Sequence, residues 1–283
     1  MSTQNRLVKK LLKKPIALFC LVVLAAYVVV AGIVFFTGFG SEWANPLAAA
    51  HLPPTFGSGY RLWFGTDVMG RSILLKLVQG VYVSINVGFG TAILSAPIGI
   101  ILGLLAGYFG GWLDEVISWL MTTLSSIPGI LLLIAISYAL GKGLFAVYVA
   151  LTSTSWIGLA RILRGEVLKH RRMEYLIAAE AIGASHSSRL FRHILPNVFH
   201  QVVLSLSFMV EMGIRSEVLL SYLGLGVQNL PSWGKMIDDA KGELHNGVWW
   251  QLTAATVAMF FLLVSLNVFG DYLRDALDPK ARY

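Results

Sequence analysis

Residues 77–113, LVQGVYVSINVGFGTAILSAPIGIILGLLAGYFGGWL, contain no Asp, Glu, Lys or Arg. About 20 consecutive, mostly apolar residues are enough for a helix to cross the hydrocarbon core of a bilayer, so this stretch predicts a membrane-spanning helix. The whole chain agrees, because 56% of its 283 residues are hydrophobic, 13% are charged and the mean hydropathy is +0.71. Soluble proteins carry about 25% charged residues, so the composition excludes a water-soluble fold.

Five further stretches without Asp, Glu, Lys or Arg occupy residues 15–41, 116–141, 143–160, 193–210 and 244–270. Together with 77–113 they predict an all-α membrane protein built as a six-span helical bundle. Residues 218–234 form one more uncharged stretch, but they include Gly224, Gly226 and Pro231. Because glycine and proline interrupt helices, we interpret this stretch as a broken or re-entrant extension of the fifth span.

The predicted spans divide the chain into segments. Residues 1–14 form a cytoplasmic N-terminal segment, 15–36 the first transmembrane helix and 37–76 an extracytoplasmic loop. Residues 77–270 form a five-span core that contains the loop 161–196, and residues 271–283 form a cytoplasmic tail. The first apolar run is longer than the roughly 7 to 15 residues of a signal-peptide core, so we expect it to be retained.

Positive charge predicts the orientation of the bundle. With the N-terminus inside, fifteen Lys and Arg residues fall on the inner side and six on the outer side, and Arg215 lies within or near the fifth span. Loops rich in Lys and Arg stay in the cytoplasm, so both termini and residues 161–196 are predicted to be cytoplasmic. The net charge of +7 favours a lipid bilayer over nucleic acid as the partner. The single cysteine, Cys20, excludes a disulfide framework and a Cys-based zinc site.

The loop 161–196 contains the string EYLIAAEAIGAS at 174–185, followed by RHILPN at 192–197. A Leu/Ile/Ala run over Glu174–Glu180 predicts a short helix, Gly183 a helix terminator and Pro196 the start of the next helix. Small side chains let a helix approach a partner closely, so the loop is typical of a docking element. The alternative is a helical hairpin that merely links two spans.

These strings resemble the cytoplasmic loop of the integral membrane permease subunits of ABC importers, which carries a motif of the form EAA-x3-G-x9-I-x-LP. Ala178, Ala179 and Gly183 fit that spacing, as do Leu195 and Pro196. Isoleucine replaces the leading glutamate of the motif and histidine replaces its isoleucine. Both departures resemble the dipeptide and oligopeptide branch of these importers.

Further strings resemble the same branch in matching order over residues 61–279. GTDVMGR at 65–71 is similar to its GTDxxGRD string, LSYLGLG at 220–226 to its LSFLGLG string and GDYLRDALDP at 270–279 to its tail. The resemblance implies the type I permease fold and ATP-driven import of peptides by alternating access. Nickel chelates and glutathione are alternative cargoes, because importers of both share this branch.

The resemblance also implies partners and a coupling site. The partners are a second homologous permease subunit, two ABC ATPase subunits or one dual-domain ATPase, and an extracytoplasmic substrate-binding protein. ATP and magnesium would be bound by the ATPase, and this chain would carry no cofactor, metal or catalytic residue. The predicted ATPase-coupling residues are Ala178, Ala179, Glu180, Ala181, Gly183 and Ala184.

Two sets of charged residues are candidates outside that loop. Asp67 and Arg71 are four positions apart where an outer helix is expected to start, with Thr66 or Asp67 as its cap, so a structural or docking role is predicted. Glu211, Arg215 and Glu217 lie in or beside the fifth span. Ionisable groups are costly within a membrane and often line a polar path, so these three form a candidate translocation path or gate. Glu211 and Arg215 are spaced to neutralise each other.

Other functions have weaker support. The chain has no GxxxxGK[ST] loop, so an ATPase must be a separate chain. An ion-coupled secondary transporter is the main alternative, but neither a carboxylate-lined cation path nor an inverted repeat is evident. A membrane-embedded hydrolase lacks an HExxH or GxSxG motif. The glycines of the second span predict close helix packing, and Pro97 and Pro128 allow bends.

Overall fold

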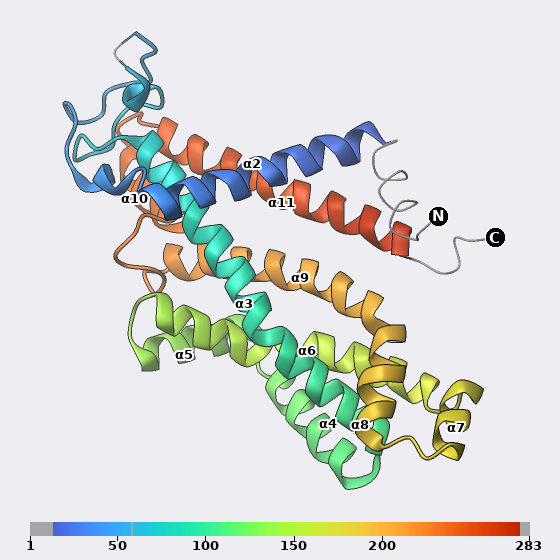
Figure 1. Cartoon of the computed structure of the whole chain (residues 1–283). Helices are drawn as coiled ribbons and strands as arrows, with labels where there is room; N and C mark the ends of the chain where they lie inside the picture. The colour runs from blue at the N-terminus through green and yellow to red at the C-terminus, as the bar shows by residue number, and fades with distance from the viewer. Residues whose placement is uncertain (1–13, 58, 278–283) are drawn as a thin grey trace.

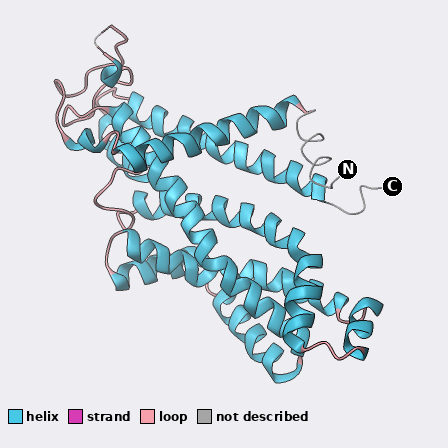
Figure 2. Ribbon diagram, in the orientation of Figure 1, coloured by secondary structure: helices cyan, strands magenta, loops and turns pink. Residues whose placement is uncertain are grey.

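The computed structural model describes residues 14–57 and 59–277 (Figure 1). Every regular element in these ranges is a helix, as Figure 2 shows, which confirms the prediction of an all-α protein. Several predicted features lie outside the described residues: positions 1–13 of the N-terminal segment with Arg6, Lys9, Lys10 and Lys13, and positions 278–283 of the tail with Lys280 and Arg282.

Five long helices form the bundle: α2 (Pro15–Thr37), α3 (Ile73–Phe109), α6 (Leu144–His170), α9 (Leu195–Tyr222) and α11 (Trp250–Leu277). The shorter helices are α4 (Gly111–Ser126), α5 (Gly129–Leu140), α7 (Glu174–Ala181), α8 (His186–Ser188) and α10 (Trp233–Leu244). Two 3-10 turns, η1 (Ser41–Ala44) and η2 (Tyr60–Leu62), lie in the loop predicted to be extracytoplasmic, called the outer loop below. A π-helical segment, η3 (Arg189–Ile194), leads directly into α9.

Four helices, α2, α3, α6 and α11, are long and apolar enough to cross a membrane, and α4 with α5 makes a fifth if this pair, bent by 89°, is one span. The remaining predicted span corresponds to α9. Its 28 residues reach about 42 Å at 1.5 Å per residue, which is long enough to cross. Glu211, Arg215 and Glu217 lower its mean hydropathy, and α9 is not among the four helices that are apolar enough to cross a membrane. That α9 crosses the membrane therefore remains a prediction.

Four of the long helices extend beyond the uncharged stretches that predicted them: α9 continues past Glu211 to Tyr222, α11 continues past Asp271 to Leu277, and α3 and α6 do so as follows. α3 begins at Ile73 and so includes Lys76, and α6 continues through Arg161 as far as His170. The first part of the predicted loop 161–196 is therefore a continuation of a spanning helix. Lys and Arg have high helix propensity, so they limit the membrane-embedded part of a helix without ending the helix.

Close packing of α3 against α6 depends on glycine. Gly99, Gly103 and Gly107 follow one face of α3, and a Cβ at each would lie 2.9, 2.7 and 2.8 Å from a backbone carbonyl oxygen of α6. Such distances leave no room for a side chain, which confirms the close-packing interpretation. Pro97 lies inside α3 without ending it, whereas Pro128 occupies the bend between α4 and α5.

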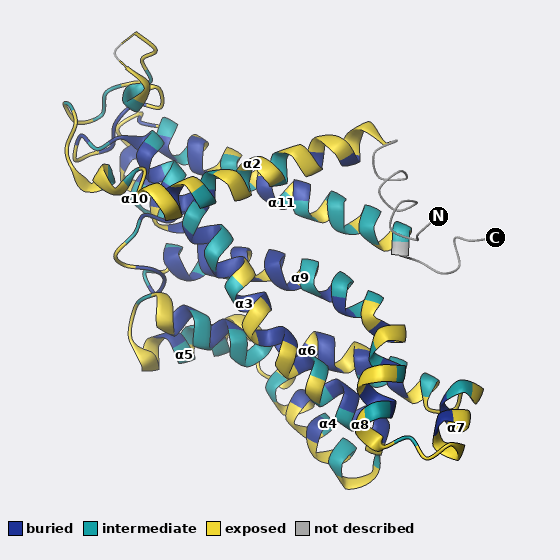
Figure 3. Cartoon of the chain, in the orientation of Figure 1, coloured by how far each residue is buried: buried dark blue, intermediate teal, exposed yellow. Residues whose placement is uncertain are grey.

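In Figure 1, α2 and α11 lie side by side, and both pack against α3. Figure 3 shows that most of α2 is exposed on its outer side. Large apolar side chains such as Ile16, Phe19 and Val22 make up this surface. An apolar surface of this kind is expected where a helix faces lipid.

Candidate coupling loop and transport surfaces

The helix predicted within the loop 161–196 is α7, and its two faces differ. Leu176 and Ala179 are buried against the rest of the protein. Ala178 and Ala181, one turn apart, are exposed, and Ile182 at the end of the helix is 84% exposed. The outward face of α7 therefore presents small and apolar side chains, and Glu174 and Glu180 are exposed beside them.

The turn that ends α7 forms as the sequence predicted. Gly183 has φ of +81°, the Gly183 N–H donates to the Glu180 carbonyl at 2.9 Å and the Ala184 N–H donates to the Ala179 carbonyl at 3.0 Å. These two bonds make a Schellman motif, which satisfies the last carbonyls of a helix and requires a left-handed residue. Gly183 therefore sets the direction in which the chain leaves α7.

The six predicted coupling residues thus share one short segment, but they do not share one surface. Ala178, Glu180, Ala181 and Gly183 are exposed, Ala184 is half-buried and Ala179 faces inward. The sequence motif could not separate these roles, because adjacent helix positions point in directions about 100° apart and the side of attachment is set by tertiary packing.

Asp67 is the centre of a buried polar cluster at the outer end. Its side chain is fully buried and accepts hydrogen bonds from the backbone N–H groups of Met69 and Arg71, both at 2.9 Å. The Arg71 Nε lies 2.7 Å and the Lys76 Nζ 3.1 Å from Asp67 Oδ2. The predicted pairing of Asp67 with Arg71 is present, and a second cation completes it.

The helix cap predicted at Thr66 or Asp67 is wrong, because Ser72 caps α3. The Ser72 Oγ accepts the Leu75 N–H at 3.4 Å. The Asp67 carboxylate is already occupied by its own turn and by two cations, and the Thr66 hydroxyl donates to the Ala49 carbonyl at 2.8 Å. The helix consequently begins several residues later than either candidate.

Lys76 joins four parts of the outer end, and the sequence did not single it out. It is 1% exposed and contacts Asp67 of the outer loop, Asp239 of α10 at 3.6 Å and the Gln251 Oε1 of α11 at 2.9 Å. A buried lysine needs such partners, because an unpaired charge inside a protein is costly. In the sequence, the only sign that this lysine is buried is its position between Leu75 and Leu77.

The surroundings of the outer acidic groups shift their pKa values in opposite directions. Burial alone would raise the pKa of the Asp67 carboxyl, but the charge of Lys76 and the hydrogen bonds from Arg71 outweigh it and hold this pKa below its usual value. Burial raises the pKa of Glu243 in α10, although its Oε1 accepts the Val68 N–H at 2.9 Å. The difference arises because Asp67 directly contacts two cations.

Glu211 and Arg215 form an ion pair on α9, as their spacing predicted. Asn267 of α11 also donates from its Nδ2 to the Glu211 Oε1 at 2.8 Å. Glu211 is nearly buried, whereas the side chain of Arg215 is 52% exposed. The pair therefore presents its positive end at the surface.

Glu217 has a different environment from the other two candidates on α9. Its side chain is fully buried, and its Oε1 accepts the Ser221 hydroxyl at 2.6 Å. Its Oε2 has no hydrogen-bond partner within the described residues. The structure therefore brings Glu211 and Arg215 together but places Glu217 in the interior, two turns of helix from Glu211.

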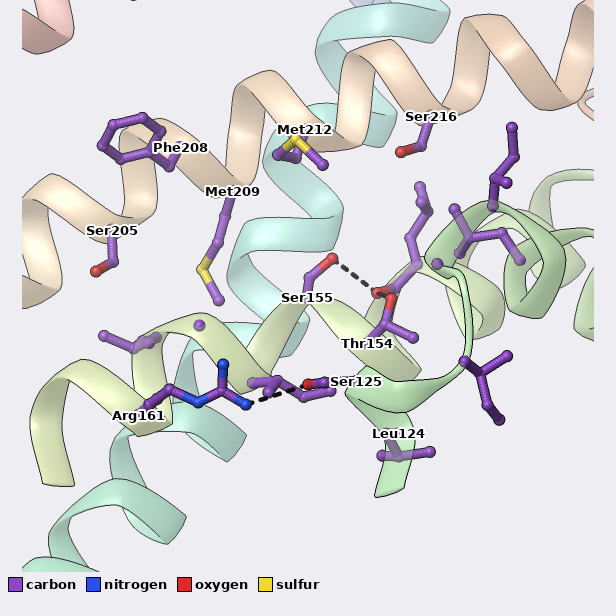
Figure 4. Close-up of a pocket in the computed structure, with 18 of the residues that line it drawn as sticks. Leu124, Ser125, Thr154, Ser155, Arg161, Ser205, Phe208, Met209, Met212 and Ser216 are labelled. Atoms are coloured by element: carbon purple, nitrogen blue, oxygen red, sulfur yellow. Dashed lines mark hydrogen bonds between the residues drawn. The ribbon is translucent and has the colours of Figure 1, made fainter. Parts of the chain in front are cut away.

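A groove of 640 Å³ lies between α9 and the helices α4, α5 and α6. In Figure 4, Ser205, Met209, Met212 and Ser216 of α9 line one side, and Thr154 of α6 faces them. The lining is mostly apolar, with hydroxyl groups spaced along it. Such a surface suits either a partner helix or a cargo with mixed polarity.

A bundle of long apolar helices, an exposed short helix at one end and a groove along its side define an integral membrane transport subunit. The family described as binding-protein-dependent transport system inner membrane component matches residues 99–283. The chain belongs to this family of ABC importer permeases, which confirms the resemblance found in the sequence. It is accordingly a multi-pass membrane protein.

Several curated proteins are similar to this chain. The oligopeptide transport system permease protein OppC of Bacillus subtilis is 40% identical over 221 residues, covering 78% of this chain and 72% of that protein. The dipeptide permease DppC of the same organism is 35% identical over 97% of this chain and 85% of its own length. The glutathione transport system permease protein GsiD of Pectobacterium atrosepticum is 36% identical over 78% of this chain and 73% of its own length.

The fold also has a solved counterpart. An inward-facing structure of the MetNI methionine ABC transporter matches with a TM-score of 0.60, covering 73% of this chain and 98% of that chain at 19% identity. At this level of identity the match supports the fold alone, and it agrees with the predicted type I permease architecture.

Proposed function

We propose that this chain is a permease subunit of an ATP-driven importer that moves di- or oligopeptides across the cytoplasmic membrane by alternating access. The membership of the family and the names of the OppC and DppC relatives support the class of transporter and its cargo. The observation that carries the coupling mechanism is the apolar, small-residue face of α7, which is exposed in the isolated chain.

ATP hydrolysis in this proposal takes place on separate ATPase chains, either two subunits or one dual-domain protein, with ATP and magnesium bound there. One ATPase subunit or domain would receive the exposed face of α7 of this chain, where Ala178 and Ala181 permit close approach. Movement of the ATPases would then shift the balance between two permease states by binding each state differently.

The translocation path would form where this chain meets a second homologous permease. The groove beside α9 has an appropriate position and lining for that contact. Arg215 does not line this groove but lies beside Ile237 of α10 and Met259 of α11, so its exposed charge is proposed to act near the path rather than within the groove. The buried Glu217 would be a gate residue reached only after a conformational change. The outer end around Asp67 and Arg71 would receive an extracytoplasmic substrate-binding protein.

The coupling surface is tested with a matched pair of substitutions. Ala178→Asp places a carboxylate on the exposed face of α7, and Ala50→Asp makes the same change at an exposed position of the outer loop. We expect Ala178→Asp to abolish co-purification of the ATPase in mild detergent and Ala50→Asp to leave it intact. Normal ATPase binding by Ala178→Asp would reject this face as the docking surface.

Cargo and energy source are tested by uptake into proteoliposomes that contain the assembled transporter and its binding protein. We expect uptake of a labelled peptide to require ATP inside, and unlabelled peptides to compete with it. Glutathione, the cargo named for the GsiD relative, is the alternative. If only glutathione or only nickel chelates compete, that compound would replace peptides as the proposed cargo. Uptake driven by an ion gradient without ATP would reject the assignment to ATP-driven importers.

The proposed orientation places both termini and the loop 161–196 in the cytoplasm. Labelling of single cysteines with a membrane-impermeant reagent tests it, after Cys20 has been replaced by alanine. We expect a cysteine at position 172 to react only in opened cells and a cysteine at position 50 to react in intact cells. The reverse pattern would overturn the orientation.

A further inference from the structure

A second cavity, of 290 Å³, lies between the end of α3 and the coupling loop, and Arg189 lines it. Arg189 is the first residue of η3, the segment that joins the loop to α9. Its side chain is only 10% exposed. A buried guanidinium requires partners, so the identity of those partners shows what this residue holds together.

Arg189 contacts three neighbouring elements. One terminal nitrogen lies 2.8 Å from the Glu180 Oε1 of α7, and the other lies 3.1 Å from the His186 Nδ1 of α8. The guanidinium carbon stands 5.7 Å from the centre of the Tyr108 ring in α3, within the range of a cation–π interaction. Among the described residues, this ion pair is the one that joins α7 to another element.

The chemistry of Arg189 also determines the state of His186. A guanidinium has donors and no acceptor, so the His186 Nδ1 must accept and the ring proton must be on Nε2. The Tyr108 hydroxyl lies 2.9 Å from the same Nδ1. This nitrogen has a single lone pair, which the Arg189 and Tyr108 donors share, so the imidazole lies between the end of α3 and the coupling loop.

We propose that Arg189 is a positioning residue that fixes the coupling helix α7 to the cytoplasmic end of α3 and so transmits movement of α7 into the membrane bundle. The inference rests on the proposed function, in which α7 receives movement from an ATPase. It adds the element that carries the movement onward: α3 packs along α6 through the glycine face, so a displaced end of α3 moves both helices together.

The first test measures the position of α7 directly. Spin labels are placed on Cys substitutions at Glu174 and Trp112, both exposed, in the full chain assembled with its partners and carrying Cys20→Ala. Arg189→Gln should broaden the distance distribution between these labels, and Arg189→Lys, which keeps the charge but not the fork of donors, should broaden it less. Arg192→Gln, an exposed neighbour on η3, is the control and should match the parent.

The second test measures coupling as the amount of peptide transported per ATP hydrolysed in proteoliposomes. Arg189→Gln should lower this ratio at least threefold, and Glu180→Gln and Tyr108→Phe should each lower it in the same direction. An unchanged ratio and distance distribution in Arg189→Gln would overturn the proposal. If Arg189→Gln fails to assemble, Glu180→Gln and Tyr108→Phe test the proposal instead. An unchanged transport ratio in both of these variants would also overturn it.

The outcomes separate this inference from the proposed function. Failure of the parent and Arg192→Gln complexes to bind an ATPase or to transport peptide would reject the proposed function. Normal transport in both, with unchanged coupling in Arg189→Gln, would reject only the role of Arg189.

Discussion

At the outer end, Lys76 and Asp67 are 1% and 0% exposed, and their charges are neutralised by residues of the same chain. At the coupling loop, the side chain of Glu180 is 66% exposed although it pairs with the buried Arg189, and the apolar face of α7 is uncovered. The buried charges at the outer end are therefore satisfied within a single chain, whereas the coupling loop leaves apolar side chains uncovered. Substitutions at the outer end should act on folding, and those at the loop on coupling.

Loss of Lys76 should have the largest effect on stability. Lys76→Met leaves a buried carboxylate with one cation fewer, and breaking a buried pair costs about 3 to 5 kcal/mol. Lys235→Met is the matched control, because Lys235 pairs with the same Asp239 at 3.1 Å but is half-exposed, and such pairs contribute about 1 kcal/mol or less. Thermal unfolding in detergent measures both, and equal losses would contradict a specific role for burial at this end.

Acid should destabilise the outer end by a smaller amount. The folded-state pKa of Asp67 is lowered, so its contribution to stability is present above the unfolded value of about 3.9 and is lost as pH falls through the lower folded-state pKa. We expect unfolding temperatures to fall over this window, and to fall less steeply in Asp67→Asn. Identical slopes in both proteins would show that Asp67 is not the group being protonated.

Replacement of Gly183 should affect the coupling loop through the backbone alone. No atom lies within 4 Å of a Cβ at this position, but φ of +81° costs an L-residue about 1 to 2 kcal/mol. Gly183→Ala should therefore reduce peptide transport while the protein still inserts. Gly165→Ala, at a helical glycine with equally open space, should be neutral or stabilising. Unaltered transport by Gly183→Ala would show that coupling does not depend on the left-handed turn at this position.

The ion pair on α9 lies between the two compared regions and should have the smallest effect. A double-mutant cycle with Glu211→Gln and Arg215→Gln should give a coupling energy of about 0.5 to 1 kcal/mol, because Arg215 is half-exposed. Folded yield and unfolding temperature measure it. Purely additive losses would reject the pairing, and a stable double variant that fails to transport would assign Arg215 to the path.

Local sequence patterns predicted the features that depend on neighbours along the chain. The uncharged stretches located the long helices, and Gly183 predicted the end of α7, since a left-handed turn is encoded by the residue that adopts it. The spacing of Glu211 and Arg215 predicted their ion pair, because residues four positions apart lie side by side on a helix. Helices α3, α6, α9 and α11 are longer than the uncharged stretches, because helix formation continues past charged residues.

The sequence by itself determined that the chain is a membrane-embedded helical protein of this family, because apolar length and short motifs are local properties. Only the tertiary structure decided that Lys76 meets Gln251 across 175 positions, that Ala179 faces inward and that Arg189 joins α7 to α3. Such contacts depend on which helix faces pack together. The free energy of a buried charge is set by the partners that this packing brings within reach, not by its neighbours along the chain.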